Sequence, residues 1–243
     1  MSSPVENIVI TSTESQVPSQ SQLRSAPDGT GFIELLDVFG NDLTVVNAAR
    51  VSFAKESKVM TEADGKLIRY LAKHNHITPF FHPQARFRIK IPIFVAREWF
   101  RHTIGFARNE VSRRYVDTEP ECWVPGADGM RERDPKLKQG SRENPCAAAD
   151  EANAVMEESM HSAMETYKRL LAMNVAPEVA RAVLPQSMYT EFIETGSLSA
   201  YARLCKLRLD PSAQAEIRMY AGMIADLLRP HFPVSWAALE GEF

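Results

Sequence analysis

The sequence predicts an α+β fold in which a mixed sheet is covered by long amphipathic helices. Strand-like runs occur at residues 32–39, 87–91 and 188–195, and longer stretches between them keep the helical spacing of apolar residues. No internal repeat is present. The chain has 243 residues, of which 44% are hydrophobic and 24% charged, so it fits one globular domain with a sizeable core, although two small domains also fit.

Residues 1–28 differ in composition from the rest of the chain. They are rich in Ser, Thr, Gln and Pro and keep no sustained period, so they cannot bury enough surface to offset the entropy of ordering. We expect them to form a disordered or loosely attached arm. Residues 29–243 are expected to form a single domain with a surface insertion at about 125–150, where Gly, Pro and charged residues replace apolar anchors.

The first half of the domain is defined by local signals. The strand at 32–39 ends at Gly40–Asp42, a turn that also caps a helix through Arg50. A capping box at Thr61–Asp64 begins a helix over 61–74, and Pro79 prevents its continuation.

Alternation predicts the next strand. Apolar residues at 87, 89 and 91 alternate with basic ones, so one face of this strand is exposed. Pro92 stands where a helix begins, and that helix carries Arg101 and His102 at its end.

The second half contains the longest helix. Apolar residues at i, i+3 and i+4 spacing extend over 150–173, and a short helix follows from Pro177 through Arg181. After the strand at 188–195, residues 197–209 return to helical spacing. Asp210 as cap and Pro211 as first helical residue predict the start of the last long helix.

Charge and cysteine usage limit the possible functions. A net charge of −3 and a pI near 6.1 argue against a protein that coats nucleic acid, so any anion site must be local. Three cysteines without a Cys-x-x-Cys pair favour a reducing compartment. The N-terminus lacks a signal-peptide pattern and no stretch is apolar enough to span a membrane, so we expect a cytoplasmic protein.

The densest polar cluster lies at residues 101–115, where four Arg, a His, an Asn, a Glu and a Ser are present. Arginine binds phosphate in a bidentate manner, a serine hydroxyl adds a hydrogen bond, and Asn or Glu can bind the edge of a base or a flavin. This inventory fits a nucleotide monophosphate. A solvated surface with ordinary ion pairs is the alternative, and composition alone does not decide between them.

The order of these residues resembles the signature of flavin-dependent thymidylate synthases, in which Arg-His-Arg is followed by Asn-Glu, a Ser and Arg-Tyr. The matching residues here are Arg101, His102, Asn109, Glu110, Ser112, Arg114 and Tyr115. Further similarity to the family lies at 37–42, 48–53, 74–80, 92–97, 178–185 and 207–217, so the resemblance spans about residues 31–236 without 125–150.

The resemblance implies a catalytic domain that methylates the uracil ring of dUMP to make dTMP. In the family an arginine favours the ionised form of the uracil N3–H, and Arg208 matches it, which makes Arg208 the expected catalytic residue. A cation beside a developing anion stabilises that anion. The resemblance assigns dUMP binding to Glu98, Arg101, Ser112, Arg113, Arg114, Arg181 and Arg208.

The same resemblance implies FAD as cofactor, NADPH as reductant and methylenetetrahydrofolate as carbon donor. It also implies a homotetramer whose FAD sites are shared between subunits. No nucleic acid, membrane or metal partner is expected. FAD binding is assigned to Thr78, Arg101, His102, Thr103, Asn109, Glu110, Ser197, Ser199 and Arg203.

Histidine and cysteine patterns favour no other chemistry. His74 and His76 are closely spaced, but no carboxylate or thiol flanks them, so we predict no metal site. Pro145-Cys146 matches a dipeptide of the flavin-free synthases, whose nucleophile is a thiolate. Cys146 lies in the polar insertion without activating neighbours, and Cys205 is interpreted as helix packing.

The sequence departs from the family pattern at several positions. Thr103 replaces the third signature residue, normally Arg, and one extra residue separates Arg101 from Ser112. Glu98 stands where Gln is common, and an acid there needs a partner such as Arg101 or Arg97. Ser197, Ser199 and Arg203 replace the usual flavin contacts, and an ordinary helical role for them is an equal alternative.

Two other functions stay open at this level. A diverged relative could transfer a hydroxymethyl group to a pyrimidine nucleotide, and the altered residues motivate that hypothesis. A non-catalytic nucleotide-binding or RNA-binding protein could retain the arginines without flavin, although the acidic pI weakens the RNA hypothesis.

Overall fold

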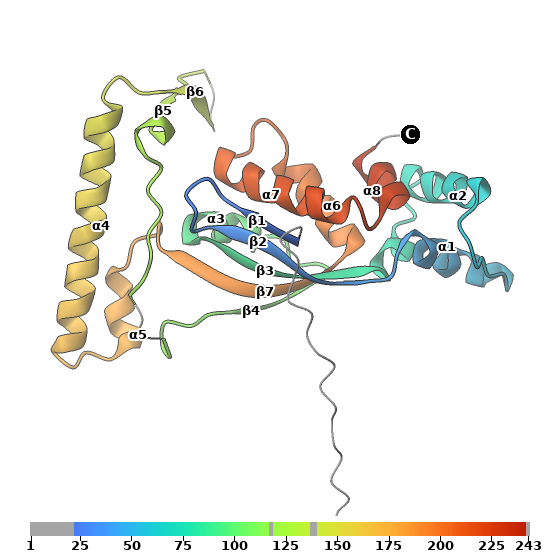
Figure 1. Cartoon of the computed structure of the whole chain (residues 1–243), viewed down its shortest axis with the longest axis horizontal. Coiled ribbons are helices and arrows are strands. Elements are labelled where there is room, and N and C mark those ends of the chain that lie inside the picture. The colour runs from blue at the N-terminus through green and yellow to red at the C-terminus, as the bar shows by residue number, and fades with distance from the viewer. Residues whose placement is uncertain (1–21, 117–118, 137–139, 242–243) are drawn as a thin grey trace, which may run out of the picture.

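The computed structural model describes residues 22–116, 119–136 and 140–241. Its centre is a five-stranded sheet in the order β1-β2-β3-β7-β4, with helices α6 and α7 across one face (Figure 1). Every pairing in this sheet is antiparallel, so the α+β class is confirmed, whereas the expectation of a mixed sheet is wrong. The strands are β1 (Leu23–Ser25), β2 (Phe32–Phe39), β3 (Gln84–Pro92), β4 (Phe106–Glu110) and β7 (Tyr189–Ser197).

The two faces of the sheet differ because side chains alternate along each strand. Phe87, Ile89 and Ile91 of β3 are completely buried under the helices. Arg86 and Arg88 point to the other face, where Arg88 pairs with Glu191 of β7 at 2.5 Å. The alternation predicted for this segment is therefore confirmed.

Helix boundaries follow the capping residues. Asn41 caps α1 and Thr61 caps α2, each in a complete capping box, as the sequence predicts for Thr61. The helices are α1 (Asp42–Arg50), α2 (Glu62–Lys73), α3 (Ile93–Trp99), α4 (Ala149–Ala172), α5 (Pro177–Ala180), α6 (Leu198–Arg208), α7 (Ala215–Leu228) and α8 (Pro233–Glu240). Short 3-10 turns are η2 (Val51–Phe53), η3 (Thr78–Phe81), η4 (Ala127–Gly129) and η5 (Arg181–Val183).

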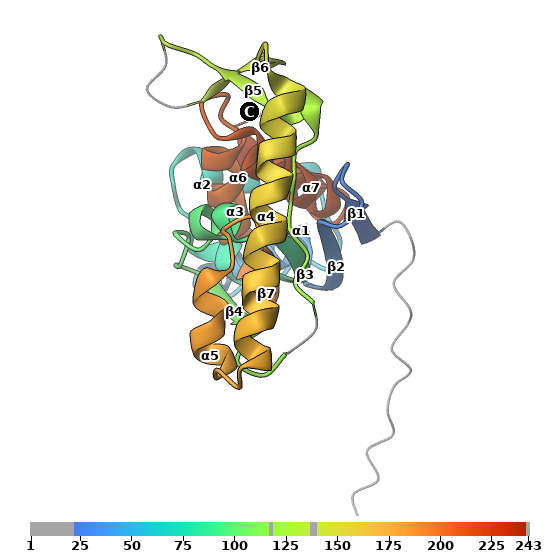
Figure 2. The same cartoon turned by 90° about the vertical axis from the view of Figure 1, so that its left-hand side faces the viewer.

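Helix α4 runs along one end of the molecule, beyond the sheet, and packs mainly on α5, η5 and η4 (Figure 2). Only Met164 and Tyr167 are buried among its described side chains. No helix in the described part of the chain is long and apolar enough to cross a membrane.

Residues 22–28, which the sequence predicted as part of the N-terminal arm, belong to the folded domain. Residues 23–25 form β1 and pair with β2, and the Tyr189 hydroxyl donates to Asp28 Oδ2 at 2.6 Å. These nonlocal contacts attach residues 22–28 to the domain, and residues 1–21 lie outside the described residues.

The insertion and the start of α7 also differ from expectation. Within 125–150, β5 (Arg131–Arg133) and β6 (Ser141–Pro145) pair as an antiparallel hairpin.

Helix α7 begins at Ala215 instead of Pro211, because Asp210 Oδ1 accepts hydrogen bonds from Ser212 in a separate turn.

Candidate functional site

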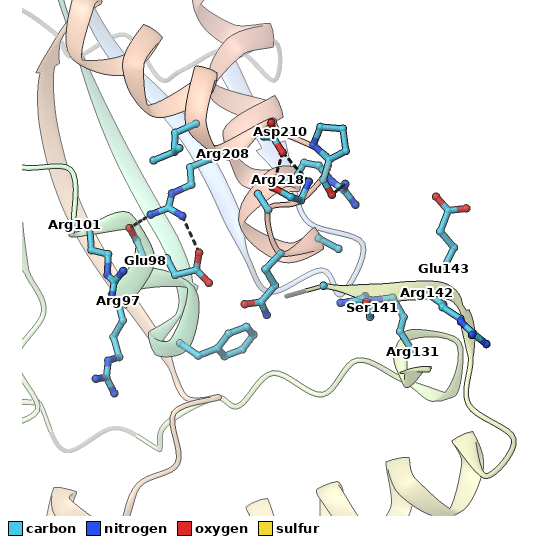
Figure 3. Close-up of a pocket in the computed structure, with 18 of the residues that line it drawn as sticks. Arg97, Glu98, Arg101, Arg131, Ser141, Arg142, Glu143, Arg208, Asp210 and Arg218 are labelled. Atoms are coloured by element: carbon cyan, nitrogen blue, oxygen red, sulfur yellow. Dashed lines mark hydrogen bonds and ion pairs between the residues drawn. The ribbon is translucent and has the colours of Figure 1, made fainter. Parts of the chain in front are cut away.

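A cavity of about 1020 Å³ opens where α3, the α6–α7 loop and the β5–β6 hairpin approach one another (Figure 3). The last turn of α3 supplies Arg97 and Glu98, and Arg101 follows it. Arg208 enters from the last turn of α6. Residues far apart in sequence are thus brought to one cavity, among them the expected dUMP contacts Glu98, Arg101 and Arg208.

Arg208 is fixed by three hydrogen bonds at the cavity wall. Its Nη1 donates to Glu98 Oε2 at 3.0 Å and its Nη2 to the Glu98 carbonyl oxygen at 2.9 Å (Figure 3). Its Nε donates to His102 Nε2 at 3.0 Å. The side chain is 13% exposed, so a ligand in the cavity would meet a guanidinium whose orientation is already set.

His102 is held neutral by this arrangement. Its pKa falls to about 4 because burial disfavours the charged ring and because Arg208, Arg108 and Arg203 add positive charge nearby. A ring nitrogen that accepts from Arg208 carries no proton, so the proton of neutral His102 lies on Nδ1. His102 therefore orients Arg208 without adding charge to the cavity.

The cavity is cationic although the whole chain carries a net charge of −3. Its charged lining residues are the cations Arg97, Arg101, Arg131, Arg142, Arg208 and Arg218 and the acids Glu98, Glu143 and Asp210. The local excess of positive charge favours an anionic ligand. The composition requires a local cationic region of this kind for any anion-binding function.

The hairpin wall of the cavity was missed by sequence reasoning. Arg131 of β5 donates to Ser141 Oγ of β6 at 2.8 Å and forms an ion pair with Glu216 of α7. Glu216 is 7% exposed, so the pair attaches the hairpin to the helical layer. Arg131 and Glu216 are 85 residues apart in the sequence. Hydrophobic periodicity depends only on residues that are near one another in the chain, so it cannot predict this contact.

The other expected dUMP contacts lie elsewhere in the same chain. Ser112, Arg113 and Arg181 line a second cavity of about 620 Å³. Arg114 is exposed, and its guanidinium lies 5.1 Å from the centre of the Tyr115 ring. The seven expected dUMP contacts are therefore divided between two places on one chain.

Several expected flavin contacts converge around a tight turn at Gly105. Its φ is +82°, and a Cβ there would lie 3.0 Å from Ser197 Oγ and from Ala200 Cβ. Arg203 of α6 donates to the Ile104 carbonyl at 2.6 Å and stacks over Phe81 of η3. Thr78 begins η3 and Thr103 lies in the turn, and both are exposed.

The two serines expected to contact the flavin, Ser197 and Ser199, are both buried in the fold. Ser197 is 4% exposed and caps α6, with its hydroxyl accepting from the Ala200 amide at 3.2 Å. Ser199 is 1% exposed. A flavin contact for either stays a prediction, and the capping bond supports the helical role for Ser197.

Asn109 and Glu110 lie at the far end of β4 from Gly105, at a third cavity of about 440 Å³. Thr190 Oγ1 donates to Glu110 Oε1 at 2.5 Å. The expected flavin contacts are thus also divided within one chain.

A buried ion pair that the sequence did not reveal lies behind the signature segment. Glu194 of β7 is completely buried and accepts from Trp99 Nε1 at 3.2 Å and from Arg108. Burial raises the pKa of Glu194, and Arg108 opposes that shift. Because Arg108 lies on β4 and Glu194 on β7, the ion pair fixes β4 on β7. The Arg108 guanidinium also lies 4.7 Å from the centre of the Phe106 ring.

The fold and the cavity define an α+β protein with a preformed, arginine-lined cavity. Residues 34–234 match the family model described as thymidylate synthase complementing protein. The chain therefore belongs to that family.

Curated relatives of this chain are flavin-dependent thymidylate synthases. A flavin-dependent thymidylate synthase of Thermus thermophilus is 41% identical over 210 residues, which cover 86% of this chain and 76% of the relative. A second, from Thermosipho africanus, is 41% identical and covers 86% and 90% of the two chains.

Solved structures confirm the fold. The UMP/dUMP methylase PolB of Streptomyces cacaoi, bound with 5-Br dUMP, superposes with a TM-score of 0.77 and 31% identity over 85% of this chain and 93% of PolB. PolB bound with 5-Br UMP gives the same TM-score at 30% identity.

Proposed function

We propose that this protein is a flavin-dependent thymidylate synthase that methylates C5 of dUMP to make dTMP. The observation that carries the proposal is the position of Arg208. The residue expected to face the pyrimidine is oriented by Glu98 and His102 at the wall of a cationic cavity. The names of the relatives support the same reaction and do not favour a hydroxymethyl product.

The cavity residues account for binding of the nucleotide. Arg208 has N–H groups for a pyrimidine carbonyl, and the exposed Arg101 and Arg97 can add positive charge for an anionic substrate. Phe94 and Leu207 give the cavity its apolar lining. Such a site binds an aromatic ring that carries carbonyl groups and an attached anion.

The residues around Gly105 fit FAD. Arg203 is exposed and donates a hydrogen bond to the neutral Ile104 carbonyl, so its charge is available to pair with a pyrophosphate or a ring oxygen. Thr78 and Thr103 are also exposed, so their hydroxyls are available to a ligand. When bound, the flavin supplies the hydride, and we propose NADPH as its reductant and methylenetetrahydrofolate as the carbon donor.

We further propose that complete sites form between subunits of a homotetramer. The support is that the expected dUMP contacts are divided within one chain. Glu98, Arg101 and Arg208 line one cavity, whereas Ser112 and Arg181 line another. A second copy can bring the Ser112 segment to the Arg208 cavity, which gives a dUMP site its phosphate contacts.

The two ligands of PolB favour UMP as a second candidate substrate. That relative is named a methylase of both UMP and dUMP, and both of its solved structures match this fold equally well. The nucleotides share the pyrimidine edge and the phosphate, so the Arg208 cavity does not separate them. Competition between UMP and dUMP in one assay decides the preference.

The test is turnover by the purified protein with FAD, NADPH and methylenetetrahydrofolate. We expect dTMP from dUMP, and we expect Arg208→Ala to abolish product while FAD stays bound. Bound nucleotide without flavin or product would instead support the non-catalytic alternative.

A further inference from the structure

Glu98 is an acid on an otherwise cationic wall of the large cavity. It shares the wall formed by the ends of α3 and α6 with Arg97, Arg101 and Arg208. The other acids of the lining lie on the β5–β6 hairpin and on the α6–α7 loop. A carboxylate weakens the binding of an anionic substrate by repulsion unless it makes a favourable contact with that substrate. The position of Glu98 therefore calls for a hydrogen-bond donor on the ligand.

The Glu98 carboxylate has one oxygen available for such a donor. Its Oε2 accepts from Arg208 Nη1 at 3.0 Å, whereas Oε1 has no hydrogen-bond partner within residues 22–116, 119–136 and 140–241. The side chain is 31% exposed, against 13% for Arg208, so the carboxylate is accessible from the cavity that both residues line. An ionised carboxylate only accepts hydrogen bonds, so the ligand group that meets it must donate.

Arg208 requires the opposite kind of ligand atom. A guanidinium only donates, and three of its five N–H groups are used by Glu98 and His102. The two that are left can bind acceptors of a pyrimidine, which are a carbonyl oxygen and the N3 atom of the ionised ring. Negative charge that develops on the ring is then stabilised by this guanidinium, as expected for Arg208. The base therefore satisfies Arg208 and leaves Glu98 for another part of the nucleotide.

The sugar of a nucleotide supplies the missing donor. A nucleotide is connected in the order base, sugar and phosphate. The side chains follow the same order, with Arg208 for the base, Glu98 in contact with it, and the exposed Arg97 and Arg101 for the phosphate (Figure 3). The donor that the sugars of dUMP and UMP share is the 3′-hydroxyl. Asp and Glu carboxylates also bind sugar hydroxyls in dinucleotide-binding folds.

We propose that Glu98 accepts a hydrogen bond from the 3′-hydroxyl of the bound pyrimidine nucleotide, while it orients Arg208 toward the base. The inference rests on the proposed function and adds a specificity-determining contact to it. A nucleotide without this hydroxyl leaves the Glu98 carboxylate without a partner on the ligand side. Removal of one partner from a charged hydrogen bond costs the desolvation of the group that is left.

The experiment compares two ligands that differ only at this hydroxyl. dUMP and 3′-fluoro-2′,3′-dideoxyUMP have almost the same shape, but the fluorine cannot donate. Their dissociation constants are measured by calorimetry on the FAD-loaded protein without folate, so that no turnover occurs. For the wild type we expect the fluorinated ligand to bind at least about tenfold more weakly, because a hydrogen bond to a charged group is lost. 2′,3′-DideoxyUMP should bind equally weakly, and affinity equal to that of dUMP would overturn the inference.

Glu98→Gln is the decisive variant because it keeps the shape of the side chain and removes its charge. The ratio of the two dissociation constants should fall below about threefold, because a hydrogen bond between neutral groups is weaker. A general disturbance around Arg208 would weaken both ligands alike and leave the ratio unchanged. Glu143→Gln removes another acid of the cavity and should keep the wild-type ratio. A ratio that is equal in Glu98→Gln and in the wild type would overturn the inference.

The outcomes separate this inference from the proposed function. If dUMP does not bind the wild type, both fail. If dUMP is bound and methylated but the fluorinated ligand binds as tightly as dUMP, only the contact between Glu98 and the sugar fails. A wild-type ratio of about tenfold or more that is lost in Glu98→Gln and kept in Glu143→Gln supports the inference.

Discussion

Arg208 Nε and His102 Nε2 lie 3.0 Å apart, and this hydrogen bond requires an unprotonated ring nitrogen. It joins the last turn of α6 to the segment that follows α3. The imidazole is therefore a fixed neutral acceptor at ordinary pH, and the guanidinium it orients faces the cavity.

The first prediction concerns the pKa of His102. An NMR titration of the wild type should give about 4, below the usual 6.5, because the ring is buried and arginines surround it. Arg208→Ala removes one of these arginines and should raise the pKa, although burial keeps it below 6.5. Arg218→Ala, a change elsewhere in the cavity, is the control. An unshifted His102 pKa in Arg208→Ala would contradict the assigned contact.

The pH dependence of stability follows from the same shift. Because the folded pKa lies below the unfolded one, the unfolded chain binds more protons between pH 6.5 and 4. The stabilisation is complete above pH 6.5 and is lost as the pH falls towards 4. Denaturant titrations should show this loss in the wild type and a smaller one in His102→Asn, and equal slopes against pH would contradict it.

A third prediction tests the buried pair of Arg108 and Glu194. Arg108→Ala leaves a completely buried carboxylate without its cation and should lower the free energy of unfolding by about 3–5 kcal/mol. Arg88→Ala breaks an exposed pair on the open face of the same sheet and should cost less than about 1 kcal/mol. Urea unfolding measures both, and similar losses would show that burial of Glu194 is not decisive.

The fourth prediction uses two ion pairs of one hairpin. Arg131 pairs with the nearly buried Glu216, whereas Arg142 pairs with the exposed Glu132 at 2.7 Å. Arg131→Ala should release the hairpin and cost about 2 kcal/mol, and Arg142→Ala should cost less than about 0.5 kcal/mol. Limited proteolysis within residues 131–145 reports the release directly. Faster cleavage in both variants alike would exclude a special role for Arg131.

The fifth prediction concerns the turn at Gly105. Gly105→Ala meets both an unfavourable φ and contacts at 3.0 Å, whereas Gly126→Ala has a similar φ of +71° and open space around its Cβ. The first should therefore lose about 1–2 kcal/mol more in free energy of unfolding. It should also weaken FAD binding, measured by flavin fluorescence. Equal effects of the two changes would show that the packing around Gly105 is unimportant.

Sequence patterns predicted those elements that local signals determine. The capping box at Thr61 and the alternation in 87–91 correspond to α2 and β3 because both depend on neighbouring residues. The predicted start of α7 was wrong because an Asp-Pro pair is compatible both with the start of a helix and with a turn. In the structure, Asp210 accepts a hydrogen bond from the Ser212 amide in a turn.

Long-range features were beyond such patterns. β1 and β4 exist because they pair with β2 and β7, and neither has enough alternating residues to be recognised alone. The candidate site shows the same limit. The family resemblance named Glu98 and Arg208, but it did not predict the contact between these two residues, which are 110 residues apart. The β5–β6 hairpin that lines the cavity was not predicted either, because both features depend on tertiary packing.

The most direct test of the account is the mass of the nucleotide formed from dUMP with methylenetetrahydrofolate, FAD and NADPH. We predict a product that is heavier than dUMP by one CH2 unit, because a methyl group replaces the C5 hydrogen, and that comigrates with dTMP. We predict no such product from Arg208→Ala. Unchanged dUMP in the presence of bound, reducible FAD, or a hydroxymethyl product, would contradict the central claim.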